Sequence, residues 1–204
     1  MISLLRSLLG DTEGMSWGLG DVIAGAWIAF ALVWLIAAFA TKATVRRQSV
    51  GSRLREALPL VVAFLLLRTN PGLMQWLSAR FVPRSFEWES LGVAVTIAGI
   101  AIAIWARFYL GANWSASVTV KQDHQLIRSG PYSVVRHPIY AGLLLAMLGT
   151  AIYVGEIRGL FAVALATWAW KMKSRLEEAF MESEFGEQYL RYRREVKGLV
   201  PFLW

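Results

Sequence analysis

The apolar residues of this 204-residue chain come in long blocks separated by short polar stretches. A helix needs roughly 20 mostly apolar residues to cross the hydrocarbon core of a bilayer. Blocks that reach or approach this length lie at about 22–40, 57–67, 91–110, 138–154 and 160–170. The pattern predicts an all-α, polytopic integral membrane protein with about five transmembrane helices, folded as one membrane domain over 1–204.

Two of the segments between the blocks carry structural information of their own. The second block is short, and Arg68-Thr-Asn-Pro71 separates it from a further apolar stretch at 73–77. It is either a broken span or a short span that ends at Arg68, whose side chain snorkels to the interface. Only Gly155–Gly159 separates the last two blocks, which predicts a helical hairpin. From Lys171 onward the chain is charged, and we expect a helical tail to about Lys197.

Composition narrows the possible chemistry. The chain contains no cysteine, which excludes disulfides and thiolate catalysis. With only His124 and His137 as histidines, no metal site is expected. The net charge of +7 favours contact with anionic lipid over nucleic acid in a chain that is 56% hydrophobic. No obligate protein partner is evident.

Basic residues also predict the orientation in the membrane. They concentrate at 42–55, 121–136 and 171–197, whereas the amino-terminal segment carries Asp11, Glu13 and Asp21. With five spans, the three basic segments fall on one side of the membrane, as the positive-inside rule requires. We therefore expect a cytosolic carboxyl terminus, with the amino terminus on the opposite side. Three amino-terminal spans would occupy 1–110, and 111–204 would hold the chemistry.

The most distinctive local pattern is the entry into the fourth block. Gly130-Pro131 indicates a turn, and His137-Pro138 places proline at the first position of a helix, with His137 as its N-cap. The free amides at that end attract anionic groups such as a carboxylate. Gly142 follows within the first turns, where a missing side chain permits the close approach of a ligand. The alternative is that these residues only anchor the chain among lipid headgroups.

Two further groups of residues are candidates for chemistry. Glu177 and Glu178 come directly after the fifth block, at the membrane face, and an apolar-aromatic helix face follows them. That tail is also consistent with an amphipathic helix lying on lipid. Arg107 lies near the end of the third block. It either snorkels to the interface or faces a polar ligand inside the bundle.

Together these motifs resemble the isoprenylcysteine carboxyl methyltransferase family over about 107–204. In order they are Asp123-His124-Gln-Leu126-Ile-Arg-Ser-Gly130-Pro-Tyr132, Arg136-His137-Pro138-Ile-Tyr140-Ala-Gly142, Glu177-Glu178, and Phe185-Gly186-Glu-Gln-Tyr189-Leu-Arg-Tyr192 with Val196 and Pro201. The resemblance implies a membrane-embedded methyltransferase that uses S-adenosyl-L-methionine and acts on a lipophilic acceptor. It also implies that the loop, the following helix and the tail enclose the cofactor at the cytosolic face.

The resemblance supplies a set of candidate site residues. The expected cofactor-binding residues are His124, Leu126, Gly130, Tyr132, Arg136, His137, Tyr140, Gly142, Glu177 and Glu178. The expected catalytic residues are Arg107, Asn113 and Glu177. The family often has an arginine one helical turn before the first of the two glutamates, where this chain has Lys173. Lysine keeps the charge but lacks the bidentate fork of arginine.

Several functions remain open from the sequence. The methyl acceptor is a prenylcysteine-type carboxylate, a phospholipid amine or another small lipid. A second enzyme class, the NADPH-dependent membrane sterol or steroid reductases, has a similar topology with a His-Pro-like element before a late helix. A third possibility is a non-catalytic membrane scaffold that keeps the fold without turnover.

Overall fold

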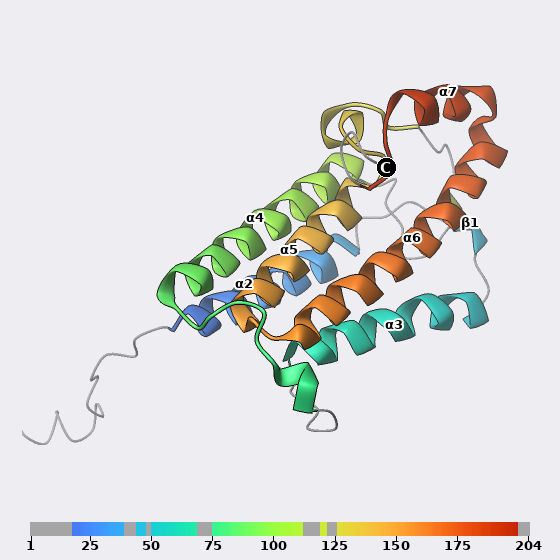
Figure 1. Ribbon diagram of the computed structural model, residues 1–204. Coiled ribbons are helices and arrows are strands. Elements are labelled where there is room, and N and C mark those ends of the chain that lie inside the picture. Colours follow the sequence, from blue (N-terminus) through green and yellow to red (C-terminus); the bar gives the residue numbers. More distant parts are fainter. Residues whose placement is uncertain are drawn as a thin grey trace, which may run out of the picture.

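The computed structural model describes residues 18–38, 44–47, 50–68, 75–111, 119–121 and 126–199. Within these residues the chain is mostly helical, and each of the five apolar blocks lies in a long helix (Figure 1). The helices are α2 (Leu19–Ala38), α3 (Val50–Arg68), α4 (Phe86–Leu110), α5 (Pro138–Val154), α6 (Ile157–Phe185) and α7 (Glu187–Glu195). Two 3-10 turns, η1 (Gln75–Ser78) and η3 (Gly130–Ser133), lie between them.

The second apolar block forms a helix that ends at Arg68. After this helix, η1 is a separate 3-10 turn, and the residues between the two lie outside the described ranges. The helix begins at Val50, earlier than the apolar block itself, and contains Pro59. A proline within a helix removes one amide and clashes with the preceding turn. Because the apolar block begins only at about residue 57, the sequence pattern missed the amino-terminal part of this helix.

The apolar surface of the bundle is that of a membrane protein. By length and hydropathy, α2 and α4 qualify as spans among the described residues, and Ala57–Arg68 and Pro138–Val154 are shorter apolar helices. Large apolar side chains on α2 and α3 are exposed, including Ile36 at 71% and Leu58 at 66%. Soluble monomers rarely expose contiguous apolar patches of this kind. These exposed apolar faces indicate an integral membrane protein.

Two short strands depart from the all-α prediction. Strands β1 (Thr44–Arg47) and β2 (Thr119–Lys121) pair antiparallel, with Thr44 opposite Lys121 and Arg47 opposite Thr119. Strands of three and four residues leave no reliable alternation in the sequence, which is why the apolar pattern missed them. The pairing brings two of the three basic segments to the same end of the bundle, as the charge distribution predicts.

Helices α4 and α5 are in backbone contact along a seam of small residues. A Cβ atom added to Gly92 would lie 2.6 Å from the Tyr153 amide nitrogen, and one added to Gly142 would lie 2.7 Å from that of Ala103. Gly99 of α4 is equally close to α5. Small residues at the interface allow two membrane helices to pack with their backbones touching. The seam makes α4 and α5 a rigid pair.

Hydroxyl groups add a polar link within this seam. Thr96 Oγ1 donates to the Gly92 carbonyl at 2.8 Å and lies 3.2 Å from Thr150 Oγ1. The Trp27 indole nitrogen of α2 donates to Thr150 Oγ1 at 3.1 Å. Hydrogen bonds across helices stabilise association where water is absent. This network attaches α2 to the α4–α5 pair.

The predicted hairpin between α5 and α6 is confirmed. Gly155 adopts a left-handed conformation, with φ of 69°, and its amide closes α5 on the Ala151 carbonyl at 2.8 Å. Just beyond the turn, Arg158 Nη1 donates to the carbonyl oxygens of Leu66 and Leu67 at 2.6 and 3.1 Å. These are carbonyls of the last turn of α3, which have no partner within the helix itself. Arg158 thereby caps α3 and joins it to the hairpin.

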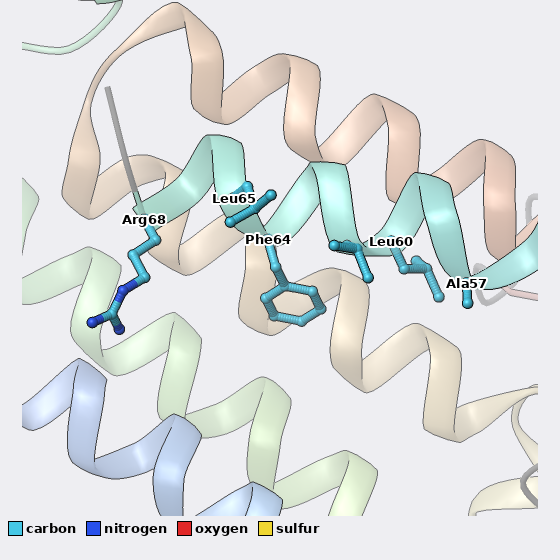
Figure 2. Close-up of a pocket in the computed structure, with 6 residues that line it drawn as sticks. Ala57, Leu60, Phe64, Leu65 and Arg68 are labelled. Atoms are coloured by element: carbon cyan, nitrogen blue, oxygen red, sulfur yellow. The ribbon is translucent and has the colours of Figure 1, made fainter. Parts of the chain in front are cut away.

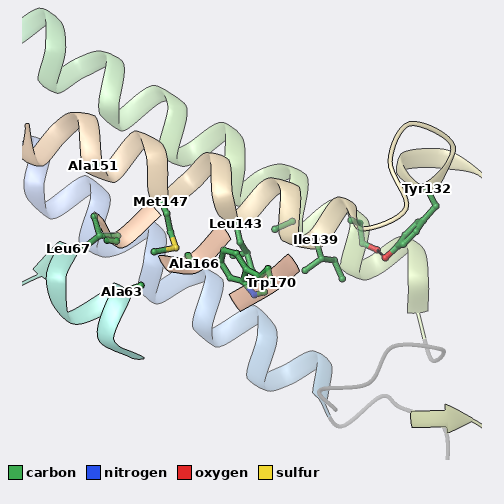
Figure 3. Close-up of a cluster of buried hydrophobic side chains, with 12 residues drawn as sticks. Ala63, Leu67, Tyr132, Ile139, Leu143, Met147, Ala151, Ala166 and Trp170 are labelled. Atoms are coloured by element: carbon green, nitrogen blue, oxygen red, sulfur yellow. Dashed lines mark hydrogen bonds between the residues drawn. The ribbon is translucent and has the colours of Figure 1, made fainter. Parts of the chain in front are cut away.

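A buried apolar cluster fills the space between α3, α5 and α6. Figure 3 shows Leu67 of α3, Leu143 and Met147 of α5, and Trp170 of α6 converging along its length. Tyr132 lies at one end of the same cluster, next to the start of α5. Towards its carboxyl end α6 leans away from α5, and α7 turns back over that end of the bundle (Figure 1). The polar residues of interest lie at this end.

Candidate active site

The start of α5 has the geometry that the sequence predicts. Gly130 adopts a φ of 59° and begins η3, and Pro138 is the first residue of α5. His137 occupies the N-cap position but makes no capping hydrogen bond with its side chain. The imidazole is therefore directed to partners outside the helix. The local sequence alone accounts for this entry, because turn glycine, N-cap and proline each have a preferred position.

Glu177 and Glu178 of α6 meet the start of α5. His137 Nε2 lies 3.0 Å from Glu178 Oε1, and His137 Nδ1 lies 3.5 Å from Glu177 Oε2. The Tyr140 hydroxyl donates to Glu177 Oε1 at 2.5 Å. Residues that are about 40 positions apart in the chain thus form one polar cluster. We call His137, Tyr140, Glu177 and Glu178 the acidic cluster.

The charges in this cluster support each other. Burial opposes the charge on His137, but the hydrogen bonds and charges of Glu177 and Glu178 outweigh it and raise the pKa of His137. Burial likewise opposes ionisation of Glu178, yet His137 and Arg136 lower its pKa from 4.5 to about 2. The pKa of Glu177 is also lowered, because His137 and Lys173 outweigh its burial. Both carboxylates are therefore ionised near neutral pH.

A row of aromatic rings leads from the acidic cluster into the bundle. The His137 and Tyr140 rings are nearly parallel, with centroids 5.7 Å apart, and the Tyr140 and Trp170 rings follow at 6.0 Å. The Lys173 ammonium lies 5.8 Å from the Tyr140 ring centroid. The sequence analysis did not select Trp170. Trp170 lies seven residues before Glu177 and therefore on the same face of α6, and this spacing could have predicted that it lies near the site.

Two tyrosines, Tyr192 and Tyr132, connect the loop before α5 to α7 and α4. The Tyr192 hydroxyl of α7 donates to the Tyr132 carbonyl at 2.5 Å, and the Tyr132 hydroxyl donates to the Ala106 carbonyl of α4 at 3.4 Å. Burial raises the pKa of Tyr132 well above its usual value, and it raises that of Tyr192 to about 12. Both hydroxyls therefore stay protonated and serve as structural donors.

Tyr109 of α4 was not selected from the sequence either. Its hydroxyl donates to Ser129 Oγ at 2.9 Å, and its ring occupies the space beside Gly130 that a side chain at that position would need. With its positive φ, Gly130 therefore has two reasons to be glycine.

The remaining predicted residues have different surroundings. Arg107 is only 2% exposed, and its guanidinium donates to the Ala37 carbonyl at 2.5 Å and to the Gly111 carbonyl at 3.0 Å. It therefore faces the bundle interior, where it joins α4 to α2, and does not snorkel. Gly142 packs against α4 in the seam, so the space of its missing side chain is used by a helix. Leu126 is partly buried, and Asn113 and His124 lie outside the described residues.

The chain is similar to known methyltransferases. The phospholipid methyltransferase family model matches residues 88–188. A protein-S-isoprenylcysteine O-methyltransferase of Schizosaccharomyces pombe is 33% identical over 101 residues, covering 48% of this chain and 43% of that one. Protein-S-isoprenylcysteine O-methyltransferase B of Arabidopsis thaliana is 27% identical over 140 residues, covering 65% and 64%. The chain thus spans less than two thirds of these relatives.

A solved structure also matches. It is the eukaryotic intramembrane Ras methyltransferase, an isoprenylcysteine carboxyl methyltransferase, with a TM-score of 0.56 and 26% identity over 91% of this chain and 66% of that one. In fold, the chain is similar to an intramembrane methyltransferase. In sequence, it is similar to the isoprenylcysteine O-methyltransferases, and residues 88–188 match the related phospholipid methyltransferase family. The predicted resemblance is confirmed.

Proposed function

We propose that this protein transfers a methyl group from S-adenosyl-L-methionine to a lipophilic acceptor at the cytosolic face of the membrane. The observation that carries the proposal is the acidic cluster. Two ionised carboxylates, an imidazole and a phenol converge where an apolar bundle meets its polar tail. The relatives named above support a methyltransferase and give no support to the reductase alternative.

The residues present fit the proposed methyl donor. Its amino group and sulfonium are cationic, and Glu177 and Glu178 supply two partly buried negative charges. Its carboxylate suits the amino-terminal end of α5, where backbone amides lack partners within the helix. Tyr140 offers an aromatic face to a cation, as its contact with the Lys173 ammonium illustrates.

The proposed site keeps most of the residues that the resemblance supplies. The proposed donor-binding residues are His124, Leu126, Gly130, Tyr132, His137, Tyr140, Glu177 and Glu178. Gly142 packs against α4 instead, and Arg136 donates to Glu178 and to the tail. Arg107, Asn113 and Glu177 are proposed toward the reacting atoms. Trp170 and Lys173 join this set, since both contact the Tyr140 ring.

The chemistry asks the protein to bind, align and exclude water. When bound, the donor supplies an activated methyl carbon that a nucleophile displaces from sulfur in line, leaving a neutral thioether. The chain then has to orient the two reactants and keep water out. The α4–α5 seam provides a rigid wall, and the tail covers the polar end. The positive charge on sulfur disappears during transfer, so a carboxylate beside it stabilises the bound donor more than the transition state. Glu177 therefore acts by positioning the donor in its reactive orientation.

The division between membrane and cytosol matches the two substrates. We propose that the five long helices α2–α6 cross the membrane and that the end bearing the acidic cluster is cytosolic. The β1–β2 pairing and the contacts between Arg136 and the tail support this proposal, because they join described parts of the three basic segments. The positive-inside rule then assigns that end to the cytosol. A polar donor arrives from there, and a lipophilic acceptor arrives through the bilayer.

An apolar surface for membrane lipid lies along α3. A shallow groove of about 390 Å³ is lined by Ala57, Leu60, Val61, Phe64, Leu65 and Arg68 (Figure 2). The Arg68 side chain lies at one end of the groove, with apolar residues along the rest of its length. Such a surface suits lipid chains, and it carries none of the acidic cluster. We therefore propose it as a lipid contact and not as the reaction site.

Two acceptor classes are supported by different comparisons. The relatives' names favour a prenylcysteine-type carboxylate, and the matching family model favours a phospholipid amine. A tritiated-methyl transfer assay with purified protein, prenylcysteine analogues and extracted membrane lipids tests the function and the acceptor together. Label in one acceptor fraction would support the proposal and name the class. No labelled product, together with no binding of S-adenosylhomocysteine in calorimetry, would leave the scaffold as the better account.

A further inference from the structure

Arg136 is surrounded by protein oxygen atoms. Its side chain is 11% exposed, and Nε and Nη2 donate to Glu178 Oε1 at 3.0 and 2.7 Å. Nη1 donates to the carbonyl oxygens of Arg193, at 3.3 Å, and of Val196. Each of the three guanidinium nitrogens thus already donates within the protein. The planar fork of arginine suits this arrangement, which lysine cannot reproduce.

The main chain beside Arg136 is joined to the same tail. The Arg136 amide donates to the Lys197 carbonyl at 2.8 Å, and the His137 amide donates to that of Gly198 at 3.1 Å. Val135 and Lys197 form a parallel bridge. The guanidinium meanwhile lies at the carboxyl-terminal end of α7, where a cation and its hydrogen bonds satisfy exposed carbonyls.

We propose that Arg136 is a positioning residue that fastens the carboxyl-terminal tail over the site and orients Glu178, without contacting the methyl donor itself. The inference rests on the proposed function, because it assigns a role within the donor site. It differs from the expectation in which Arg136 is one of the residues that bind the donor. Its hydrogen-bonding capacity is directed instead to Glu178 on one side and to α7 on the other.

The same contacts couple the tail to the acidic cluster. If the tail separated from the loop, Arg136 would lose both of its carbonyl acceptors. Arg136 would then no longer be fixed to α7, and Glu178, which it contacts, would be held less firmly. Tyr192 would lose its hydrogen bond to the Tyr132 carbonyl in the same movement. Coupling between two events is reciprocal. Donor binding therefore favours a docked tail, and a docked tail favours donor binding.

The experiment compares two ligands on variants of Arg136. S-adenosylhomocysteine carries the amino-acid group, and 5′-methylthioadenosine lacks it. We expect Arg136→Gln to weaken S-adenosylhomocysteine by roughly tenfold or more and 5′-methylthioadenosine by less, because only the first ligand carries the amino group that faces Glu178. Arg136→Lys should recover part of that loss for both ligands, since it keeps the charge near Glu178. The acceptor KM should stay within about twofold of wild type, because acceptor contacts are untouched.

The tail gives a second readout that does not depend on ligand. Trypsin should remove the basic end of α7 faster from Arg136→Gln than from wild type. Arg194→Gln is the matched control, because it removes the same charge from an exposed position 3.9 Å from Glu187. We expect it to bind both ligands as wild type does. Circular dichroism and gel filtration in detergent check that each variant is folded.

Each outcome has one meaning. A loss confined to S-adenosylhomocysteine, with an unchanged rate of tryptic cleavage, would show direct contact with the donor's amino-acid group and would overturn the inference while leaving the proposed function intact. Equal losses with an unchanged rate of tryptic cleavage would also overturn it. A wild-type protein that binds neither ligand would refute the proposed function, and the inference with it.

Discussion

The α4–α5 seam and the acidic cluster share helix α5 but are held together by different means. In the seam, glycines such as Gly92 and Gly99 bring backbone against backbone, and an added methyl group has no room. In the cluster, His137, Glu177 and Glu178 are joined by side-chain hydrogen bonds between segments far apart in the chain. Close packing resists small changes, whereas a polar network exchanges partners when a ligand arrives. The comparison indicates a rigid support beneath an adjustable site.

The largest expected effect comes from the cluster. Replacing Glu177 with Gln keeps its size but removes the charge that faces His137, Tyr140 and Lys173. We expect methyl transfer to fall by about 10³-fold, comparable with the removal of one essential electrostatic contact in other enzymes. The thermal unfolding midpoint in detergent should also fall, because His137 and Lys173 stabilise the charge of Glu177 in the folded state. If transfer persisted near the wild-type rate, Glu177 would have no role in the proposed chemistry.

Stability against pH separates the cluster from the seam, because only the cluster titrates. The pKa of Glu178 is lowered from 4.5 to about 2, so its contribution is present above pH 4.5 and is lost as pH falls towards 2. By the linkage relation this contribution is on the order of 3 kcal/mol. The pKa of His137 is raised, so its contribution is present below pH 6.5 and is lost as pH rises through the higher folded-state value.

Unfolding midpoints measured between pH 3 and 9 check this prediction. Wild type should lose stability at both ends of the range. Glu178→Gln should be less stable near neutral pH and should lose less on acidification. An acid limb of the same size in that variant would mean that Glu178 does not determine it.

A change in the seam should affect stability more than chemistry. In Gly99→Ala the new methyl group would meet the Ala146 backbone of α5. We expect a loss of about 2 kcal/mol in unfolding free energy, because overpacking forces the helices apart. Gly25→Ala is the matched control, since a methyl group there meets no atom of the described residues within 4 Å. That variant should be neutral or slightly stabilised, because alanine favours a helix.

The smallest expected effect comes from the contact between α4 and the loop before α5. Tyr109 of α4 donates to Ser129 Oγ in an exposed hydrogen bond of 2.9 Å. Tyr109→Phe keeps the ring against Gly130 and removes only this bond, so we expect a loss of at most about 1 kcal/mol. Affinity for S-adenosylhomocysteine, measured by calorimetry, should fall no more than about fivefold. A larger loss would mean that the hydroxyl, and not the ring, supports the loop.

Much of the fold was predictable because membrane helices follow from local composition. The five apolar blocks and the turn at Gly155 all appear as expected. The start of α3 was not predicted, because the polar residues after Val50 join the helix despite leaving no apolar signal. The strands β1 and β2 were missed because each exists only through the other, at a separation of more than 70 residues.

The candidate site was likewise predictable only where the local sequence carries a signal. His137, Pro138, Glu177 and Glu178 stand out because each lies at the end of an apolar block, where a polar group has a definite reason to be. Trp170 and Tyr109 do not stand out, since aromatic residues are common in membrane helices. Gly142 was expected to permit the close approach of a ligand, whereas the structure packs α4 against it.

By itself, the sequence determined the helices, the hairpin, the shared end of the basic segments and the entry to α5, because these depend on residues close together in the chain. Only the tertiary structure decided that Arg136 faces the tail, that Arg107 caps carbonyls inside the bundle, and that Tyr140 meets Glu177. Those outcomes depend on which of several possible oxygen atoms comes within hydrogen-bonding distance. The sequence predicts that a buried arginine will be hydrogen-bonded, but the tertiary packing determines which oxygen atom is its partner.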